Sequence, residues 1–419
     1  MDRSRLEPLG VPGADYGLEE VASRQEPSAF DRWLLRQINT RLGADSPVRA
    51  SLWDEPDVTP RDGQARVRIL DRKALWQVIV RPDLHFGDLY SAGRIQVRGD
   101  LLTVLLEAYR YTEKFSAIGE VLTRGRKLAP DISDSKRNIH HHYDLGNDFY
   151  KLWLDREALQ YTCAYFAAPD MTIEQAQQAK MHHVCRKLQL KAGERVVEAG
   201  GGWGGFALFM AKNYGVRVRS FNISKEQIAH SRAWAKQLGL DGLVEFVEDD
   251  YRNLTGTYDA FVSIGMLEHV GKGNYRDLGA LMSRALTKDG RGLVHSIGRD
   301  TPALMNAWID KRIFPGAYPP TLREMMDMFE PNKLSVLDVE NIRLHYAKTL
   351  EWWLQRYEEN VDTVREMFDE TFVRAWRLYL VGSIAAFLAG KLQLFQVLYA
   401  RTGAKNVPWT RAHVYRDHP

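Results

Sequence analysis

Cysteine is nearly absent from this chain of 419 residues, in which Cys163 and Cys185 are the only two. So few cysteines exclude a disulfide-stabilised scaffold and a zinc site built from cysteine ligands, and they favour a reducing compartment. A strong charge of one sign is also missing, because 57 Lys and Arg residues stand against 54 Asp and Glu residues. A net charge this close to zero does not predict binding to nucleic acid.

Targeting signals and long apolar runs are missing as well. The N-terminal segment has no apolar core of the kind found in secretory signals, and no stretch reaches the ~18 apolar residues of a transmembrane helix. The most apolar segment, Leu378–Gly390, is too short to span a bilayer, and we interpret it as a buried or interfacial helix. We therefore expect a cytoplasmic protein that contacts the inner face of the membrane peripherally. The sequence leaves open whether it forms a homodimer.

The composition is that of a globular protein, with 45% apolar and 26% charged residues. We expect a flexible N-terminus over 1–25, a small α+β domain over 26–119, a linker over 120–137 and a catalytic domain over 138–419.

Hydrophobic periodicity differs between the two predicted domains. In the small domain, alternation of apolar and polar residues predicts strands at 65–70 and 74–80, and helical spacing predicts a helix at 100–115. In the catalytic domain, strands alternate with helices, which predicts parallel βαβ units and a doubly wound sheet. The tail over 369–401 is predicted as one long apolar helix.

A glycine-rich turn at 198–205 is the sharpest local signal in the chain. It follows a predicted strand and precedes a helix that starts near Phe206, so the helix N-terminus faces any ligand at the turn. The spacing also fits a dinucleotide-binding fold, but the second strand ends at 221–224 without the acid that binds the ribose there. An acid before the glycines, here Glu198, resembles instead the first motif of class I S-adenosylmethionine methyltransferases. A tight turn without a ligand is the plainer alternative.

Further motifs lie on both sides of this turn. In chain order they are HYDLGNDFY at 142–150, YTCAYF at 161–166, NISKEQ at 222–227, GMLEHVG at 265–271, LVHSIG at 293–298 and IFPG at 313–316. In this order they resemble the cyclopropane-fatty-acyl-phospholipid synthase family, relatives of the mycolic acid cyclopropane synthases, from about Asn138 to Arg401. The segment 86–90 resembles more loosely an accessory domain of the phospholipid-acting members, which implies a phospholipid with an unsaturated acyl chain as the substrate.

The resemblance implies a fold, a cofactor site and an ion site. The fold is α/β, a class I, Rossmann-like doubly wound sheet with helical additions, preceded by the small α+β domain. S-adenosylmethionine is expected to contact Tyr161, Thr162, Val196, Val197, Glu198, Ala199, Gly200, Gly201, Gly202, Trp203, Gly204, Asn222, Ile223, Ser224, Lys225, Glu226, Gln227, Asp250 and Tyr251. A bicarbonate ion is expected at Cys163, Glu268, His295, Ile297 and Tyr346, and no metal site is expected.

The chemistry of this family needs such residue types. A cis alkene takes a methyl group only from a strongly electrophilic donor, and the attack leaves a carbocation on the acyl chain. Ring closure then requires a base beside the cation in a pocket closed to water. His295 and Tyr346 can donate hydrogen bonds to bicarbonate as that base, and Glu268 either accepts the bicarbonate hydroxyl or is itself protonated.

Taken singly, several of these residues have plainer interpretations. Glu268 fits an ordinary helix cap, and His295 fits a core histidine. The consecutive histidines 140–142 do not share a face, so we expect a polar loop there rather than a metal cluster. Cys185 lies in a helical pattern and is expected in the core.

Three positions depart from the family pattern. Gly201 replaces a usual cysteine, Glu198 replaces a usual aspartate, and both changes keep the local chemistry. Ser383 stands where relatives carry a cysteine, which the bicarbonate mechanism does not need.

Three functions therefore remain after the sequence is read. They are a cyclopropane synthase acting on phospholipids, a methyltransferase that gives methyl-branched acyl chains, and a non-catalytic lipid-binding relative. Retention of the ion-site residues argues against the third function. The sequence does not determine the acyl chain length, the double-bond position or the head group.

Overall fold

The computed structural model describes residues 25–61, 63–113 and 145–415. The predicted linker and the histidines 140–142 lie outside the described residues, as does nearly all of the predicted N-terminal segment. The chain divides into two units that alternate along the sequence. Of the described residues, the first unit holds those between 25 and 113, 304–315 and 353–390, and the second holds 145–303, 316–352 and 391–415.

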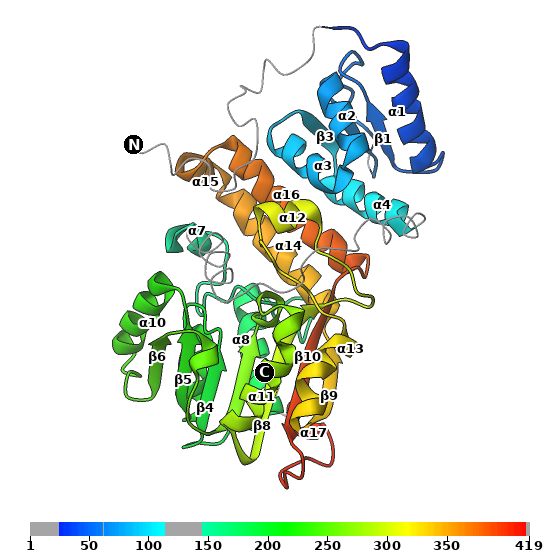
Figure 1. The fold of residues 1–419 in the computed structure, drawn as a ribbon. Coiled ribbons are helices and arrows are strands. Elements are labelled where there is room, and N and C mark those ends of the chain that lie inside the picture. The colour runs from blue at the N-terminus through cyan, green and yellow to red at the C-terminus, as the bar shows by residue number, and fades with distance from the viewer. Residues whose placement is uncertain (1–24, 62, 114–144, 416–419) are drawn as a thin grey trace. The chain divides into compact units, whose positions relative to one another are not determined.

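The first unit contains a small sheet with helices packed around it (Figure 1). Its elements are α1 (Ala29–Leu42), β1 (Val48–Ser51), β2 (Ala65–Ile69), α2 (Arg72–Val80), α3 (Pro82–Ser91), β3 (Ile95–Gly99), α4 (Leu101–Glu113), α12 (Ala307–Arg312), α15 (Val361–Met367) and α16 (Glu370–Leu388). β1 is parallel and β3 antiparallel to the central β2. Leu52, Ile69, Leu75 and Ile95 are fully or almost fully buried between the sheet and the helices.

Segment 86–90 of α3 packs against a helix from much later in the chain. Gly87 touches Trp308 of α12 so closely that a Cβ there would lie 2.4 Å from the indole Cγ. Next to Gly87 in α3, Asp88 accepts two hydrogen bonds from Arg312, at 3.0 and 2.9 Å, and both side chains are buried. A buried, doubly hydrogen-bonded ion pair of this kind fixes the position of α12 on α3.

Helix α16 joins the same unit through Arg374. Its guanidinium donates to the carbonyls of Tyr90 and Ile95, at 2.6 and 3.0 Å, and lies 4.6 Å from the centre of the Tyr90 ring. The structural division therefore differs from the linear one expected from the sequence. Two stretches of the predicted catalytic segment, 304–315 and 353–390, belong with the N-terminal helices and strands.

The second unit is a seven-stranded sheet with helices on both faces. The strand order is β6-β5-β4-β7-β8-β10-β9, in which only β10 runs antiparallel to its neighbours. The strands are β4 (Arg195–Ala199), β5 (Arg217–Asn222), β6 (Val244–Glu248), β7 (Tyr258–Ile264), β8 (Leu286–Gly298), β9 (Leu334–Asn341) and β10 (Gln393–Arg401). The helices are α7 (Asn147–Lys151), α8 (Ile173–Lys187), α9 (Gly205–Tyr214), α10 (Lys225–Gln237), α11 (Tyr275–Ala285), α13 (Leu322–Phe329) and α17 (Ala412–Tyr415), while α14 (Arg343–Glu359) crosses the division.

Two apolar layers hold this sheet between its helices. One layer contains side chains of α8, α9 and α10, and the other contains side chains of α11 and α13 (Figure 1). In β4, Val196 belongs to the first layer and Val197 to the second, as expected for successive residues of a strand. Strands β4 and β7 therefore carry apolar residues on both faces, and the predicted doubly wound sheet is confirmed.

Two expectations about secondary structure were wrong. Residues 74–80 form most of helix α2 rather than a strand, because Asp71 caps the helix by accepting from the amide of Ala74. The tail is not one helix, since α16 ends at Leu388 and the chain continues through Gly390, at φ +73°, into β10. β10 is inserted between β8 and β9, so its apolar residues face both helical layers.

Helix α16 is the one described helix that is long and apolar enough, by length and composition, to cross a membrane. However, 67% of its apolar window is buried inside the structure. That burial is typical of a core helix, in agreement with the predicted buried segment.

Candidate active site

The carboxyl ends of β4, β5 and β6 hold most of the residues expected to bind the cofactor. The chain passes outward from β4 to β5 and β6 and then returns to β7 on the other side of β4. Open α/β sheets bind ligands at such a reversal of strand order. Residues 196–199 are buried in β4, Asn222 ends β5, and 225–227 form the first turn of α10.

The glycine turn has the backbone conformation that the sequence predicts. Gly200, Gly202 and Gly204 have φ values of +87°, +53° and +84°, which side-chain-bearing residues rarely adopt. α9 begins directly after the turn without a side chain capping its first residues. Its first amides are therefore available to a ligand at the turn.

Gly201 is explained by a neighbour from β5. A Cβ at Gly201 would lie 1.9 Å from the hydroxyl oxygen of Ser220. That hydroxyl donates to Glu198 Oε2 at 2.7 Å. The space that a side chain at 201 would need is thus filled by Ser220. Burial raises the pKa of Glu198 to about 7, and the Ser220 hydrogen bond opposes this shift.

The loop after β5 is fixed by its own side chains. Asn222 donates to the carbonyl of Gly202 at 2.9 Å and to Gln227 Oε1 at 2.8 Å, and it accepts from the amide of Ser224 at 3.1 Å. Ser224 caps α10. These bonds tie the predicted adenosine loop, including Ile223, Lys225 and Glu226, to the glycine turn.

The predicted adenine contact lies at the end of β6. Asp250 caps the short helical turn η2 (Tyr251–Asn253) and forms an ion pair with Arg252 at 3.1 Å. The Arg252 guanidinium also lies 5.2 Å from the centre of the Tyr251 ring. Asp250 therefore has a structural role in addition to any contact with a ligand.

An aromatic cluster stands beside the glycine turn. Tyr150 lies between Tyr161 and Trp203, with ring centres 5.4 and 5.0 Å away, and Trp153 lies 5.2 Å from Tyr161. The indole of Trp203 donates to Asn147 of α7 at 2.7 Å. The predicted motif 142–150 thus reaches the glycine turn through its described residues.

The residues predicted to hold bicarbonate begin with Glu268, in the short turn η3 (Leu267–His269). Its Oε1 accepts from the main-chain amide of Ile297 at 2.6 Å. Its Oε2 is buried and has no hydrogen-bond partner among the described residues. Burial raises the pKa of Glu268 to about 7. A buried carboxylate oxygen with no partner is costly, and a ligand that donates a hydrogen bond would satisfy it.

His295 lies two residues before Ile297 on the same face of β8, and it is buried. Its Nδ1 faces Gln396 Nε2 of β10 at 3.2 Å. Gln396 Oε1 accepts from the ammonium of Lys187 at 2.9 Å, and an ammonium can only donate. The amide nitrogen of Gln396 must therefore donate to His295 Nδ1, so the proton of a neutral His295 is on Nε2.

The charge state of His295 agrees with this tautomer. Burial, together with the charges of Lys180 and Lys187, lowers the pKa of His295 to about 3, so the ring is neutral near pH 7. Nε2 has no hydrogen-bond partner in the described part of the chain. His295 consequently carries an N–H donor near the end of β8, and Glu268 is bound to the same strand through the amide of Ile297.

Cys163 is a neutral thiol in this structure. It is fully buried, its Sγ donates to the carbonyl of Ala164 at 3.1 Å, and burial raises the pKa of the thiol. The amide of Ala164 donates to Thr349 of α14 at 3.0 Å. Tyr346 lies one turn earlier in α14 and is half-buried, and its direct approach to Glu268 or His295 stays a prediction.

Sequence reasoning missed several polar residues in this region. Lys180 of α8 is fully buried and donates to Gln160 Oε1 at 2.5 Å and to Thr162 Oγ1 at 3.0 Å. Burial lowers the pKa of Lys180 to about 8. Lys187 lies two turns later on the same helix, and Gln396 links it to His295. No three-residue group of His, Cys, Asp or Glu that fits a metal occurs among the described residues.

Replacing Glu268 by Gln is expected to stabilise the protein at alkaline pH. The folded-state pKa of about 7 is raised above the unfolded value, so the stability contributed by Glu268 is present at low pH and is lost as the pH rises through 7. Glu268→Gln should raise the free energy of unfolding by up to about 3 kcal/mol at pH 8, with the gain shrinking toward pH 4.5. Urea denaturation at both pH values measures this difference.

Glu324→Gln provides a control of opposite sign. Burial acts to raise the pKa of Glu324, but hydrogen bonds from Lys272, Thr321 and Tyr318 hold it below the usual value. This variant should therefore lose stability at pH 8. A destabilised Glu268→Gln protein at pH 8 would contradict a buried carboxylate at 268 with one unsatisfied oxygen.

Comparison with known proteins places the chain in a family. A family model described as mycolic acid cyclopropane synthetase matches residues 131–397. The chain belongs to this family. The resemblance expected from the sequence motifs is confirmed.

Curated relatives extend the match beyond the family model. A probable fatty acid methyltransferase of Pseudomonas putida is 34% identical over 388 residues, which cover 88% of this chain and 96% of the relative. The cyclopropane-fatty-acyl-phospholipid synthase of Escherichia coli K12 is 40% identical over 266 residues, covering 63% of this chain and 68% of the relative. A tuberculostearic acid methyltransferase of Mycobacterium tuberculosis is 32% identical over 405 residues, which cover 90% of this chain and 92% of the relative.

A solved structure confirms the fold class. A mycolic acid cyclopropane synthase crystallised with SAH and CTAB is 28% identical, with a TM-score of 0.61, and the match covers 66% of this chain and 100% of that one. Coclaurine N-methyltransferase, at 22% identity and a TM-score of 0.59, shares the fold. The chain is thus a methyltransferase with the class I fold.

Proposed function

We propose that the protein transfers a methylene group from S-adenosylmethionine to the cis double bond of an unsaturated phospholipid acyl chain, which forms a cyclopropane ring. The observation that carries the proposal is the pair of unsatisfied groups at the end of β8. Glu268 offers a buried acceptor without a partner, and His295 offers an Nε2–H donor. Bicarbonate has one hydroxyl to donate and several oxygens to accept, so this pair fits it.

The two groups that the reaction needs have distinct tasks. S-adenosylmethionine, when bound, supplies an electrophilic methyl group, and bicarbonate, when bound, supplies a base. The alkene carbon gains the methyl group and leaves a cation on its neighbour. Loss of one proton from the new methyl group then frees the C–H electron pair, which forms the third bond of the ring.

This chain's residues orient the base and exclude water. In this proposal, His295 Nε2–H and the hydroxyl of Tyr346 donate to the ion, and Glu268 Oε2 accepts from it. Cys163 acts as a neutral wall, because its buried thiol is protonated. Ser383 lies in α16 of the first unit, and the proposed mechanism gives it no role.

A second candidate is methyl transfer to the same alkene followed by loss of a different proton, which gives a methyl-branched chain. The relatives that match 88% and 90% of this chain favour it, because their names are fatty acid methyltransferase and tuberculostearic acid methyltransferase. The cyclopropane synthase match is closer in identity but shorter.

Product analysis separates the two candidates. The gene is expressed in a bacterial host that lacks both activities, and the extracted phospholipids are examined by proton NMR. Ring methylene protons, which resonate far upfield of vinylic and methyl-branch protons, are expected. Signals of a methyl branch without ring signals would support the second candidate, and unchanged lipids would contradict both. Mass alone does not suffice, because a ring and a branched alkene are isomers.

A substitution in the glycine turn tests the cofactor site. Gly202 has φ +53° and open space where a Cβ would lie, so a side chain there enters the region proposed for the cofactor. Asn tolerates this backbone conformation, so Gly202→Asn should fold. We expect its affinity for S-adenosylhomocysteine, measured by calorimetry, to fall at least ~100-fold, since the side chain and ligand compete for space.

Gly239→Asn is the matched control. Gly239 has φ +67° and also open space, but it follows α10 on the surface, away from the turn. Its affinity should equal that of the wild type. Equal affinities for all three proteins would move the cofactor away from the glycine turn.

The substrate fixes where such an enzyme must work. An acyl double bond lies inside a bilayer, so a protein with its catalytic unit in water must approach the membrane surface. We propose peripheral contact with the inner face of the cytoplasmic membrane.

A further inference from the structure

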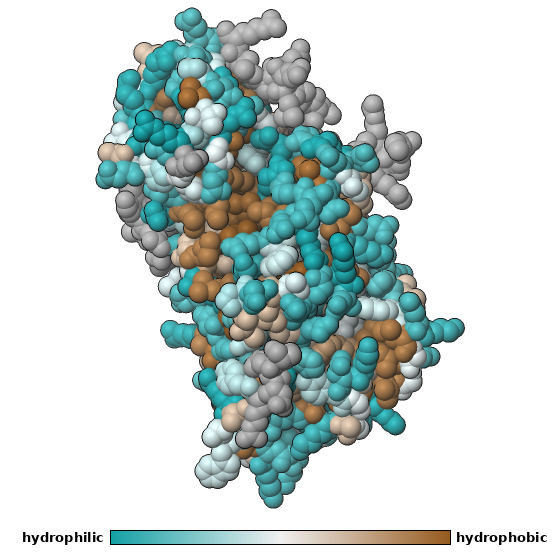
Figure 2. All heavy atoms as spheres, turned by 180° about the vertical axis from the view of Figure 1, so that it is seen from behind, coloured by the Kyte–Doolittle hydropathy of each residue, from teal (hydrophilic) through white to brown (hydrophobic). Residues whose placement is uncertain are grey.

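An exposed aromatic patch occurs on the first unit. Hydrophilic side chains cover most of the face drawn in Figure 2, and apolar side chains also form several areas on it. On α1 and α2, four large apolar side chains are exposed together: Phe30 at 50%, Trp33 at 46%, Trp76 at 43% and Val80 at 68%. We refer to these four residues as the aromatic patch.

The rings of the aromatic patch are in mutual contact. The Phe30 ring is stacked on Trp33, with centres 5.5 Å apart, and lies 5.6 Å from Trp76 of the other helix. Val80 follows Trp76 by one turn on the same face of α2. The two helices therefore present one continuous apolar surface rather than scattered residues.

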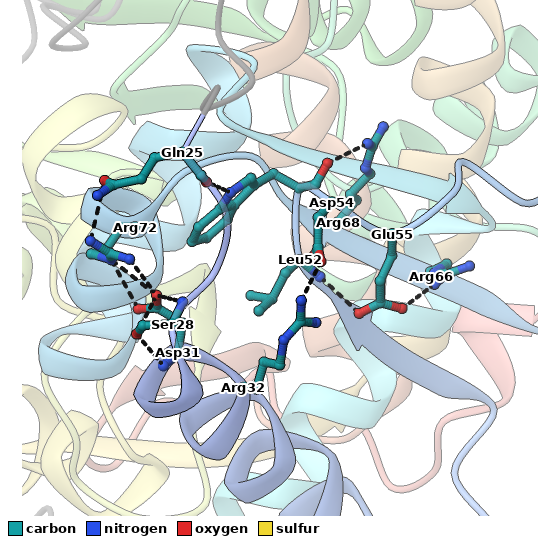
Figure 3. Close-up of polar contacts among 11 residues, drawn as sticks. Gln25, Ser28, Asp31, Arg32, Leu52, Asp54, Glu55, Arg66, Arg68 and Arg72 are labelled. Carbon is teal, nitrogen blue, oxygen red and sulfur yellow. Dashed lines mark hydrogen bonds and ion pairs between the residues drawn. The ribbon is translucent and has the colours of Figure 1, made fainter.

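A polar clamp holds the two helices in this arrangement (Figure 3). Asp31 forms a capping box with Ser28 at the start of α1 and is itself only 1% exposed. Arg72, the first residue of α2, donates to both Asp31 oxygens, with distances of 2.8 to 3.2 Å. Gln25 accepts from Arg72 at 3.2 Å, and its carbonyl accepts from the Trp53 indole at 2.6 Å. The aromatic patch is thus pre-formed and does not need to order itself on binding.

Unpaired cations border the aromatic patch. Arg36 lies one turn after Trp33, and Lys73 lies one turn before Trp76, and both are exposed. Neither makes an ion pair with any residue that the structure describes. The acid nearest in sequence on α1, Asp31, is buried and already neutralised by Arg72. The exposed charges on the two helices beside the aromatic rings are therefore positive, although Glu26, ahead of α1, is exposed as well.

We propose that the aromatic patch, with Arg36 and Lys73, docks the protein onto an anionic phospholipid surface. Tryptophan and phenylalanine favour the boundary between head groups and acyl chains, and each nearby cation adds attraction to anionic lipids. A second copy of the chain is the less suitable occupant, because an isologous contact through this surface would bring like cations together. The inference rests on the proposed function, which requires an approach to the bilayer.

Vesicle sedimentation tests the docking surface. The probe is a vesicle of diphytanoyl phosphatidylglycerol and diphytanoyl phosphatidylcholine, which lacks the alkene that the catalytic unit would recognise. The variant combines Phe30→Gln, Trp33→Gln and Trp76→Gln, since Gln favours helices and these side chains are half-exposed. We expect its vesicle affinity to fall at least tenfold. Arg36→Gln and Lys73→Gln should each lower it about fivefold, with the loss disappearing at high salt.

Trp409→Gln is the matched control, because Trp409 is fully exposed in the second unit. Its vesicle affinity should stay that of the wild type. Undiminished sedimentation of the triple variant would overturn the proposal. Light scattering that shows a wild-type dimer and a monomeric triple variant would overturn it too, since the patch would then join two copies.

A second assay separates this inference from the proposed function. With unsaturated phospholipid dispersed in detergent, the triple variant should turn over like the wild type, because no membrane surface has to be found. With vesicles of the same lipid, its turnover should fall with its affinity. A wild type without product in detergent would contradict the proposed function, while the diphytanoyl vesicles would still report on docking.

Discussion

Replacing Glu268 by Gln, or Tyr346 by Phe, is expected to lower turnover by about 10²–10³ while the affinity for S-adenosylmethionine stays that of the wild type. Glu268→Gln keeps the size of the side chain but puts an amide where Oε2 stands without a partner. Tyr346→Phe removes one donor. Both changes remove hydrogen bonds proposed to hold the base, and neither alters the glycine turn. Single-turnover kinetics and calorimetry with S-adenosylhomocysteine measure the two quantities separately.

Tyr258→Phe is a control for the tyrosine change, because the hydroxyl of Tyr258, at the start of β7, donates to the carbonyl of Thr255 just before the strand. Its turnover should be unchanged. If bicarbonate is the base, wild-type activity should also fall in carbonate-depleted buffer and return when bicarbonate is added. Full activity of Glu268→Gln and Tyr346→Phe in carbonate-free buffer would remove the ion site from the mechanism and leave the cofactor site standing.

Replacing Gln396 by Glu is expected to reverse the tautomer of His295 and to lower turnover by about 10² or more. The carboxylate has the shape of the amide, and one oxygen still accepts from Lys187. The other oxygen can only accept, so it takes the proton of His295 on Nδ1 and leaves Nε2 without one. The donor toward the ion site is then lost. Assay at pH 8 keeps the histidine neutral.

Nitrogen-15 NMR of histidine-labelled protein reports the tautomer directly. Wild-type His295 should show a protonated Nε2, and the Gln396→Glu variant a protonated Nδ1. Gln396→Met removes the hydrogen bond without imposing either tautomer, so its loss of turnover should be smaller. A Gln396→Glu protein with the reversed tautomer and full turnover would show that the Nε2–H donor is dispensable.

Local patterns in the sequence were sufficient to predict the part of the second unit that contains the proposed cofactor site. The strands β4 to β8 are predicted from short segments of apolar or alternating residues, and the glycine turn is predicted from residues whose positive φ few other residues adopt. Each of these signals depends on neighbours a few positions away. That is why the strand–turn–helix element and the doubly wound sheet were predicted correctly.

Sequence patterns that fit both a strand and a helix gave wrong predictions where a helix cap or a glycine turn selected the secondary structure. Residues 74–80 have a pattern compatible with strand or helix, and the cap by Asp71 selects the helix. In the tail, Gly390 in the left-handed region ends the helix, and residues 393–401 form a strand because they pair with β8 and β9. The pairing partners are more than 50 residues away from β10 in the sequence.

The polar residues around the ion site were hidden from sequence reasoning for a physical reason. Lys180 and Lys187 repeat along α8 at helical spacing, which normally marks a solvent-facing side, yet both are buried. Their burial is compensated by Gln160, Thr162 and Gln396, which come from distant segments. Periodicity alone cannot find such partners.

The sequence by itself thus determined the family, the class I fold and the turn proposed to hold the cofactor, because these depend on short-range patterns of glycines, acids and apolar residues. Only the tertiary structure decided the division into units, through the contacts of Arg312 and Arg374 with α3. It also decided the tautomer of His295, because a lysine on α8 orients an amide on β10. The division into units and the tautomer both depend on pairs of polar groups that must form hydrogen bonds with each other once they are buried. Burial is a property of the whole fold.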